Sequence, residues 1–120
     1  MLDRAERLQR QFSYQVMDAW EPPADVLESG GELRVHIALP GVPPASIAIV
    51  VEPGGVSVSG LRAFPCREEG AHIHRIEIPY GRFERRIVLP LADPYGGLKL
   101  AGKSLVDGVL TLTFRRKEGA

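Results

Sequence analysis

Two histidines, His72 and His74, have the spacing in this sequence that comes nearest to a site for chemistry. Side chains two positions apart point to the same face of a β-strand, and imidazole nitrogens are common zinc ligands. With His36 or Glu77 as a third ligand, the pair would form the kind of metal site that a metal-dependent oxidoreductase or isomerase needs. However, no histidine follows His74, and a metal site requires three or four ligands that converge on one point. Two exposed histidines on an edge strand explain the spacing more simply, so we predict no bound metal.

The other reactive side chains form no recognisable catalytic motif. None of the serines has the surroundings of a nucleophile elbow, and the single cysteine, Cys66, has no histidine and asparagine or aspartate signature that would activate it. The glycine pairs belong to no GxxxxGK[ST] phosphate loop, and hairpin turns explain them. Arg82, Arg85 and Arg86 form a basic cluster with only Phe83 near it as a stacking aromatic, so ion pairs are the simpler explanation. The sequence therefore predicts no enzyme activity, no cofactor and no nucleic-acid partner.

The composition is that of one domain with no overall charge. The 120 residues include 15 basic and 15 acidic side chains, so no long-range field favours nucleic acid or an anionic membrane. The charge is uneven along the chain, because residues 1–60 carry 8 acidic and 4 basic side chains (net −4) and residues 61–120 carry 7 acidic and 11 basic ones (net +4). This division is compatible with antiparallel self-association, although solvated faces alone would also produce it.

Cysteine content and hydropathy bear on the compartment. A single cysteine excludes an internal disulfide and fits a reducing compartment. Charged residues interrupt the first 20 positions too often for a signal peptide. No apolar run approaches the roughly 20 residues that cross a bilayer. We therefore predict a cytoplasmic protein with no membrane span.

Residues 1–19 are predicted to form a helical arm. Along residues 3–18 the apolar side chains recur at steps of three or four, which places them on one face of an amphipathic helix. These side chains are Ala5, Leu8, Phe12 and Val16. Asp3 is a suitable N-cap, and the two prolines at positions 22 and 23 prevent continuation. A helix of this length is marginal alone, so it must dock on the domain, on a second copy, or on a client.

From Asp25 onward the period of the sequence changes to two, which is typical of β-strands. Short apolar runs follow one another, separated by Gly and Pro, and this rhythm favours an antiparallel sandwich. The predicted strands are residues 33–39, 47–51, 56–60, 72–78, 83–89 and 109–115. The run at 47–51 is apolar on both faces and needs a cover on each side, while residues 61–71 interrupt the rhythm as one long charged loop.

Six pieces of sequence, taken in order, resemble the α-crystallin domain of small heat shock proteins. The pieces are Trp20 to Glu28, Leu39 to Val42, Val58 to Gly60, Arg75 to Glu77, Tyr80 to Pro90 and Asp107 to Leu112. The resemblance spans residues 20–116, and six pieces in the right order make it more specific than any one of them. It implies an all-β fold, an immunoglobulin-like antiparallel β-sandwich preceded here by the short N-terminal helix.

The resemblance also implies which residues join two copies of the chain. Arg85 falls at the position of the family's interface arginine, where a guanidinium is suited to a multidentate carboxylate pair across chains. Arg75 and Glu77 lie in the segment that bacterial members exchange with the partner subunit. We therefore expect a swapped homodimer in which residues 70–78 pair with the partner's strand near residues 25–28.

The sequence departs from the family pattern at both ends. The family's C-terminal extension carries an I-x-I/V motif that docks in a groove of another dimer, and the tail at residues 117–120 contains no such motif. The arm at residues 1–19 is also short. We expect a dimer or a small oligomer rather than a large shell.

The function implied by the resemblance is that of a holdase, which binds non-native client proteins without ATP and keeps their apolar patches apart. The residues predicted to bind clients are Leu8, Phe12, Val16 and Met17 of the arm, Ile47, Ile49 and Val51 of a groove strand, and Leu98 and Leu100 opposite it. Core packing is the alternative for the groove residues, because one face of that strand must be internal. A second function is that of an adaptor or co-chaperone module on the same sandwich, which would bind one defined partner.

Overall fold

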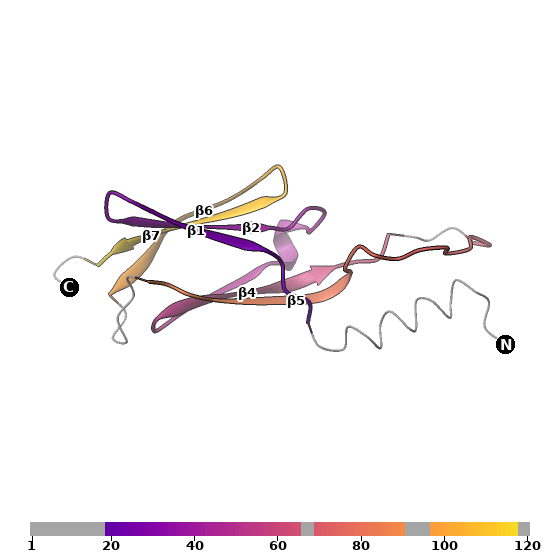
Figure 1. Cartoon of the computed structure of the whole chain (residues 1–120), viewed down its shortest axis with the longest axis horizontal. Coiled ribbons are helices and arrows are strands. Elements are labelled where there is room, and N and C mark those ends of the chain that lie inside the picture. Colours follow the sequence, from indigo (N-terminus) through magenta and orange to yellow (C-terminus); the bar gives the residue numbers. More distant parts are fainter. Residues whose placement is uncertain (1–18, 66–68, 91–96, 118–120) are drawn as a thin grey trace.

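The computed structural model of the protein describes residues 19–65, 69–90 and 97–117. Within these ranges lie seven strands and one 3₁₀ helix: β1 (Ala24–Ser29), β2 (Glu32–Ala38), η1 (Pro44–Ser46), β3 (Ala48–Glu52), β4 (Gly55–Arg62), β5 (Gly81–Val88), β6 (Leu98–Val106) and β7 (Val109–Arg116). One antiparallel sheet has the order β1-β2-β7-β6 and the other has the order β3-β4-β5. The two sheets are the layers of a sandwich (Figure 1), so the predicted all-β sandwich is confirmed. The predicted helix of the arm lies outside the described residues.

Strands β2 and β7 occupy the centre of the four-stranded sheet, and their alternating sequences give the sheet one apolar face. Leu33 pairs with Phe114 and Val35 pairs with Leu112, and all four side chains are 0% exposed. Removing an apolar side chain of this size from water stabilises the fold by roughly 1.5–3 kcal/mol. The period of two that predicted these strands therefore also identifies half of the core.

Strands β4 and β5 supply the opposite wall of the core through Val56, Val58 and Phe83, which are 0% exposed. Trp20 extends this sheet from outside the named strands. Its backbone N–H donates to the carbonyl of Arg82 (3.2 Å), and the N–H of Glu84 donates to the carbonyl of Trp20 (3.0 Å). The outer edge of β5 is thereby paired with the segment that precedes β1.

A close approach at Gly60 and a turn at Gly108 explain two glycines that the sandwich needs. A Cβ at Gly60 would lie 2.6 Å from the Ser46 carbonyl oxygen and 2.7 Å from the Phe83 ring, so no side chain fits there. In the β6-β7 hairpin, Asp107 and Gly108 have φ angles of 51° and 76°, which suits a turn with two left-handed residues. The chain reverses at these two positions, between the end of β6 and the start of β7.

Five of the six predicted strands are confirmed, with ends that differ from the prediction by no more than two residues. The strand predicted at residues 72–78 is wrong for the single chain, because no strand within residues 19–65, 69–90 and 97–117 pairs with this segment. The sequence also failed to predict β6 as a strand. Its alternation is broken by a register shift between Leu100 and Gly102, and two lysines and a glycine dilute its apolar pattern.

Candidate functional site

An apolar groove of about 230 Å³ lies between β3 and β6, which are edge strands of opposite sheets. It is lined by Pro44, Ile47, Ile49, Lys103, Ser104, Leu105 and Leu110. Ile47, Ile49 and Leu105 pack against the core but remain only partly buried. The groove thus exists because the sandwich is open on this side, where neither sheet covers the apolar side chains of the other.

The structure brings some of the predicted groove residues together and separates others. Ile47 and Ile49 line the groove, and Val51 follows on the same strand with 44% of its surface exposed. Leu100 is partly buried against the core, and Leu98 is only 5% exposed and belongs to the core itself. Neither of these leucines lines the groove.

Leu105 and Leu110 take the place opposite Ile47 and Ile49, and the sequence reasoning did not include them. The signal that would have found them is the turn at Asp107-Gly108. A two-residue hairpin turn at this point sets Leu105 directly across from Leu110, as the structure has them.

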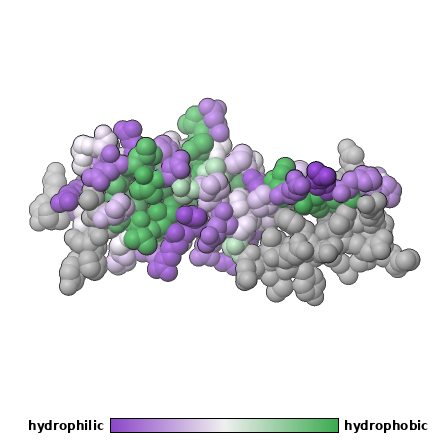
Figure 2. All heavy atoms as spheres, viewed as in Figure 1, coloured by the Kyte–Doolittle hydropathy of each residue, from purple (hydrophilic) through white to green (hydrophobic). Residues whose placement is uncertain are grey.

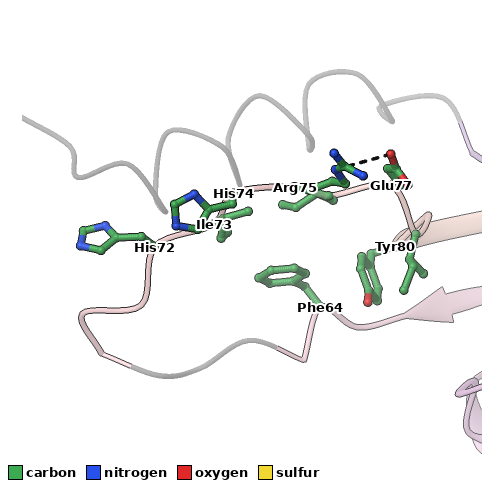
Figure 3. A pocket seen from close by; sticks show the side chains of 9 residues that line it. Phe64, His72, Ile73, His74, Arg75, Glu77 and Tyr80 are labelled. Atoms are coloured by element: carbon green, nitrogen blue, oxygen red, sulfur yellow. Dashed lines mark ion pairs between the residues drawn. The ribbon is translucent and has the colours of Figure 1, made fainter.

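A long loop leaves the sandwich where β4 and β5 stop pairing, at Arg62 and Gly81. The loop, residues 63–80, extends well beyond the ends of the two strands (Figure 1). Phe64 and Tyr80 close its base with an edge-to-face contact, with ring centroids 5.2 Å apart and an interplanar angle of 82°. Beyond this contact lies a hollow of about 500 Å³, lined by the two rings and by residues 72–78 (Figure 3).

The residues predicted for the dimer interface occupy two places. Arg75 and Glu77 lie on the loop, 79% and 74% exposed, with Nε of the arginine 3.8 Å from Oε1 of the glutamate (Figure 3). Arg85 lies on β5, and its Nη1 is 3.9 Å from Oε2 of Glu21. The Nε of Arg85 is buried and has no hydrogen-bond partner in the part of the chain that the structure describes. The Nε–H group of Arg85 is therefore a buried donor left unsatisfied by the described chain.

The histidines do not come together as a metal site. His72 and His74 lie on the loop (Figure 3), whereas His36 lies on β2 with its Nδ1 3.0 Å from the hydroxyl of Thr111. Over residues 19–65, 69–90 and 97–117, no three His, Cys, Asp or Glu side chains are placed to hold a metal ion. Cys66 lies outside the described residues.

One buried charge was missed by the sequence reasoning. Arg62, the last residue of β4, is 8% exposed, and its guanidinium donates to backbone carbonyls of Pro79 and Pro40. A period of two from the buried Val56 and Val58 places Arg62 on the same inward face of β4. That register was the available signal.

Apolar surface is not confined to the groove. Figure 2 shows apolar side chains gathered both over the sandwich and along the loop, interspersed with hydrophilic ones. Val26 and Leu27 of β1 are 40% and 51% exposed, and Val50 of β3 is 54% exposed. No helix among the described residues is long and apolar enough to cross a membrane.

Comparison with curated proteins gives relatives from plants and a bacterium. The chain is 37% identical over 103 residues to the 19.0 kDa class II heat shock protein of Oryza sativa subsp. japonica. This alignment covers 79% of this chain and 57% of the relative. It is 31% identical over 99 residues to spore protein SP21 of Stigmatella aurantiaca, which covers 82% of this chain and 57% of that protein. The chain thus spans a little over half the length of these relatives.

Solved structures share the fold. HspA from Xanthomonas axonopodis superposes with a TM-score of 0.66 and 28% identity over 84% of this chain and 98% of that chain. A small heat-shock protein from Xylella fastidiosa gives a TM-score of 0.63 and 31% identity over 84% of this chain and 90% of that chain. The family described as Hsp20/alpha crystallin matches residues 25–120, which include every strand of the sandwich except the first residue of β1. With a match over this much of its length, the chain belongs to the Hsp20/alpha crystallin family, the small heat shock proteins.

Proposed function

We propose that this protein is an ATP-independent holdase that binds unfolding proteins in the cytoplasm and prevents their aggregation. The observation that carries the proposal is the groove between β3 and β6, where Ile47, Ile49 and Leu105 remain partly exposed on a folded domain. Partly exposed apolar surface of this kind binds the apolar segments that a client exposes as it unfolds. Membership of the small heat shock proteins, a family of chaperones rather than enzymes, supports the same function.

The arm is proposed as a second client-binding element. Leu8, Phe12, Val16 and Met17 would present one apolar helical face. These positions lie outside the described residues, so the proposal for them rests on the spacing of the sequence alone. Together with the groove, the arm would let one chain hold two segments of a client.

The functional unit is proposed to be a homodimer joined through the loop. Residues 72–78 belong to no strand and join neither sheet among the described residues, and β1 is an edge strand with one side free of described neighbours. Adding the loop segment of one copy to β1 of the other would satisfy both sets of backbone groups. The buried Nε–H of Arg85, which has no partner among the described residues, supports its proposed pairing with a carboxylate of the second copy.

The test is suppression of light scattering when several unrelated proteins are heated with the purified protein. A holdase should suppress the scattering of all of them at near-stoichiometric ratio, without nucleotide. In the Ile49→Lys variant a charge enters the groove, and we expect suppression to weaken. Val106→Lys is the matched control, because Val106 is 62% exposed on β6 and does not line the groove. Equal activity of the wild type and Ile49→Lys would contradict a client site in the groove.

A variant without residues 1–19 tests the arm in the same assay. We expect reduced suppression, with the sandwich still folded by circular dichroism. Unchanged suppression would remove the arm from the client-binding surface and leave the groove as the proposed site.

The size of the groove favours one alternative. A volume of about 230 Å³ holds a few side chains of a single peptide segment, which is what an adaptor or co-chaperone module would bind. An adaptor should bind one partner saturably and suppress the aggregation of no unrelated protein. The scattering assay therefore separates the two functions.

A further inference from the structure

Arg62 is a buried cation whose hydrogen-bond partners are neutral backbone carbonyls. Its Nε donates to the carbonyl of Pro79 (2.9 Å), its Nη2 donates to the same carbonyl, and its Nη1 donates to the carbonyl of Pro40 (3.0 Å). The guanidinium also lies 4.6 Å from the centroid of the Trp20 ring and 5.5 Å from that of Tyr80. Its charge is thus held by two backbone dipoles and two π faces.

These contacts lie where the backbone ladder of the β4-β5 hairpin ends. The last ladder pair joins Arg62 to Gly81, and the next residues on each side belong to the loop. The side chain of Arg62 reaches past this pair to Pro79 and so ties the departing leg of the loop to the returning leg. The bond to Pro40 ties both legs to the turn that follows β2, in the other sheet.

Only arginine among the side chains can make this set of contacts. The guanidinium is planar, so it can stack on rings while its edge donates two hydrogen bonds to one carbonyl and a third to another. The ammonium of a lysine has no plane to stack and no fixed fork. An apolar side chain would close this end of the sandwich without the cost of burying a charge. The arginine therefore points to a requirement for the direction of the loop rather than for stability alone.

We propose that Arg62 is the positioning residue for self-association. Its hydrogen bonds to the carbonyls of Pro79 and Pro40 and its contacts with the Trp20 and Tyr80 rings are together called the clasp. The clasp fixes the direction in which the loop leaves the sandwich, so that residues 72–78 can reach a second copy of this chain. This inference rests on the proposed loop-mediated dimer, and it adds the residue that makes the loop competent to form it.

The experiment compares the full chain with Arg62→Lys, which keeps the charge and loses the fork and the stacking. Sedimentation velocity over a range of concentrations gives the Kd of self-association, and we expect Arg62→Lys to weaken it about tenfold or more. Trypsin cleavage after Arg75, followed by mass spectrometry below the Kd, should become faster because the loop is no longer held. Ile87→Val is the matched control, since Ile87 is a buried core residue of β5 that makes no contact in the clasp and its truncation lowers the Tm.

Equal loss of self-association in Arg62→Lys and Ile87→Val would overturn the proposal, because stability alone would then explain both. If Arg62→Lys fails to fold, Tyr80→Leu removes one π face of the clasp outside the core cluster and should weaken the Kd about threefold. An unchanged Kd in that variant would also overturn the proposal.

A variant lacking residues 64–74 separates this inference from the proposed dimer. If the deletion abolishes self-association while Arg62→Lys leaves the Kd unchanged, the dimer stands and the role of Arg62 is wrong. If the deletion leaves self-association unchanged, the loop-mediated dimer is wrong. In that case the cleavage rate after Arg75 still decides whether Arg62 positions the loop.

Discussion

Replacing Gly60 by alanine should destabilise the sandwich, whereas the same change at Gly102 should not. The new Cβ at position 60 would lie 2.6 Å from the Ser46 carbonyl oxygen and 2.7 and 2.9 Å from two atoms of the Phe83 ring. Ordinary contacts of a Cβ begin near 3.4 Å, so the backbone at Ser46 or the buried ring must move by several tenths of an ångström. Both glycines lie in strands and neither has a positive φ, so backbone strain does not contribute to the difference.

The expected magnitude follows from two opposing effects. Overpacking of a core costs about 1–3 kcal/mol, and replacing glycine by alanine stabilises by about 0.4–1 kcal/mol through the unfolded chain. Because Phe83 is 0% exposed and cannot swing outward, we take the upper part of the first range. The net loss for Gly60→Ala is then about 2 kcal/mol, or about 8 °C in Tm at roughly 4 °C per kcal/mol.

Urea unfolding followed by the fluorescence of Trp20 is a suitable assay, because this is the single tryptophan and its ring centroid lies 5.4 Å from that of Phe83. Protein concentration must be the same for all variants, since self-association adds to apparent stability. Gly102→Ala has no described atom within 4 Å of the new Cβ, so it should match or slightly exceed the wild type. The reasoning is refuted if Gly60→Ala is as stable as Gly102→Ala.

Two further substitutions test the packing and the surface charges. Phe114→Ala removes a side chain that is 0% exposed at the centre of the sheet and should cost about 3–5 kcal/mol, whereas Val106→Ala, at a 62% exposed position, should stay within about 0.5 kcal/mol of the wild type in urea unfolding. Glu32→Gln weakens an ion pair in which Nε of Arg115 donates to Oε1 at 2.7 Å. Because the arginine side chain is 60% exposed, the loss should be less than about 1 kcal/mol and should shrink in 1 M salt, and a larger loss that is independent of salt would contradict an exposed pair.

The sequence predicted the centre of the sandwich well because the signals there are local. In β2 and β7 every second residue is apolar and buried, because one face of the sheet covers the core and the other does not. The Asp107-Gly108 turn needs left-handed backbone angles that these residue types tolerate. Each of these features can be recognised within a window of about ten residues.

The parts that escaped prediction depend on contacts between distant segments. Leu105 lines the groove because the register of the β6-β7 hairpin sets it across from Leu110, but β6 itself has no clear alternating pattern by which it could be predicted as a strand. Leu98 was expected opposite the groove strand, but the same register puts it at the far end of β6, in the core. Arg62 falls in the charged loop predicted at residues 61–71, whereas the structure has it as the buried last residue of β4, hydrogen-bonded to Pro40 and Pro79 from other segments.

Two of the four edge strands of the sandwich are blocked against pairing with another chain. An edge with unpaired backbone groups is a template for a new strand unless a charge, a bulge or a cover prevents it. The outer side of β5 is covered by Trp20, whose backbone bonds to Arg82 and Glu84. Strand β6 carries Lys99 and Lys103, together with the register shift near Gly102. Neither edge offers a flat, unprotected ladder.

The other two edges, β1 and β3, have no register shift and no described cover, and their only charged side chains are acidic: Asp25 and Glu28 in β1 and Glu52 in β3. Their sequences, ADVLES and AIVVE, contain no lysine and no proline, their pairing with β2 and β4 shows no register shift, and both expose apolar side chains such as Leu27 and Val50. In a monomer, unpaired edges of this kind promote aggregation, because their free backbone groups can pair with strands of other chains. Pairing each edge with a defined segment prevents this. In the proposed dimer the loop at residues 63–80 of a second copy would cover β1, and the β3 edge with its groove would remain as the proposed client surface. The distribution of protected and unprotected edges therefore supports one self-association surface and one client surface on each sandwich.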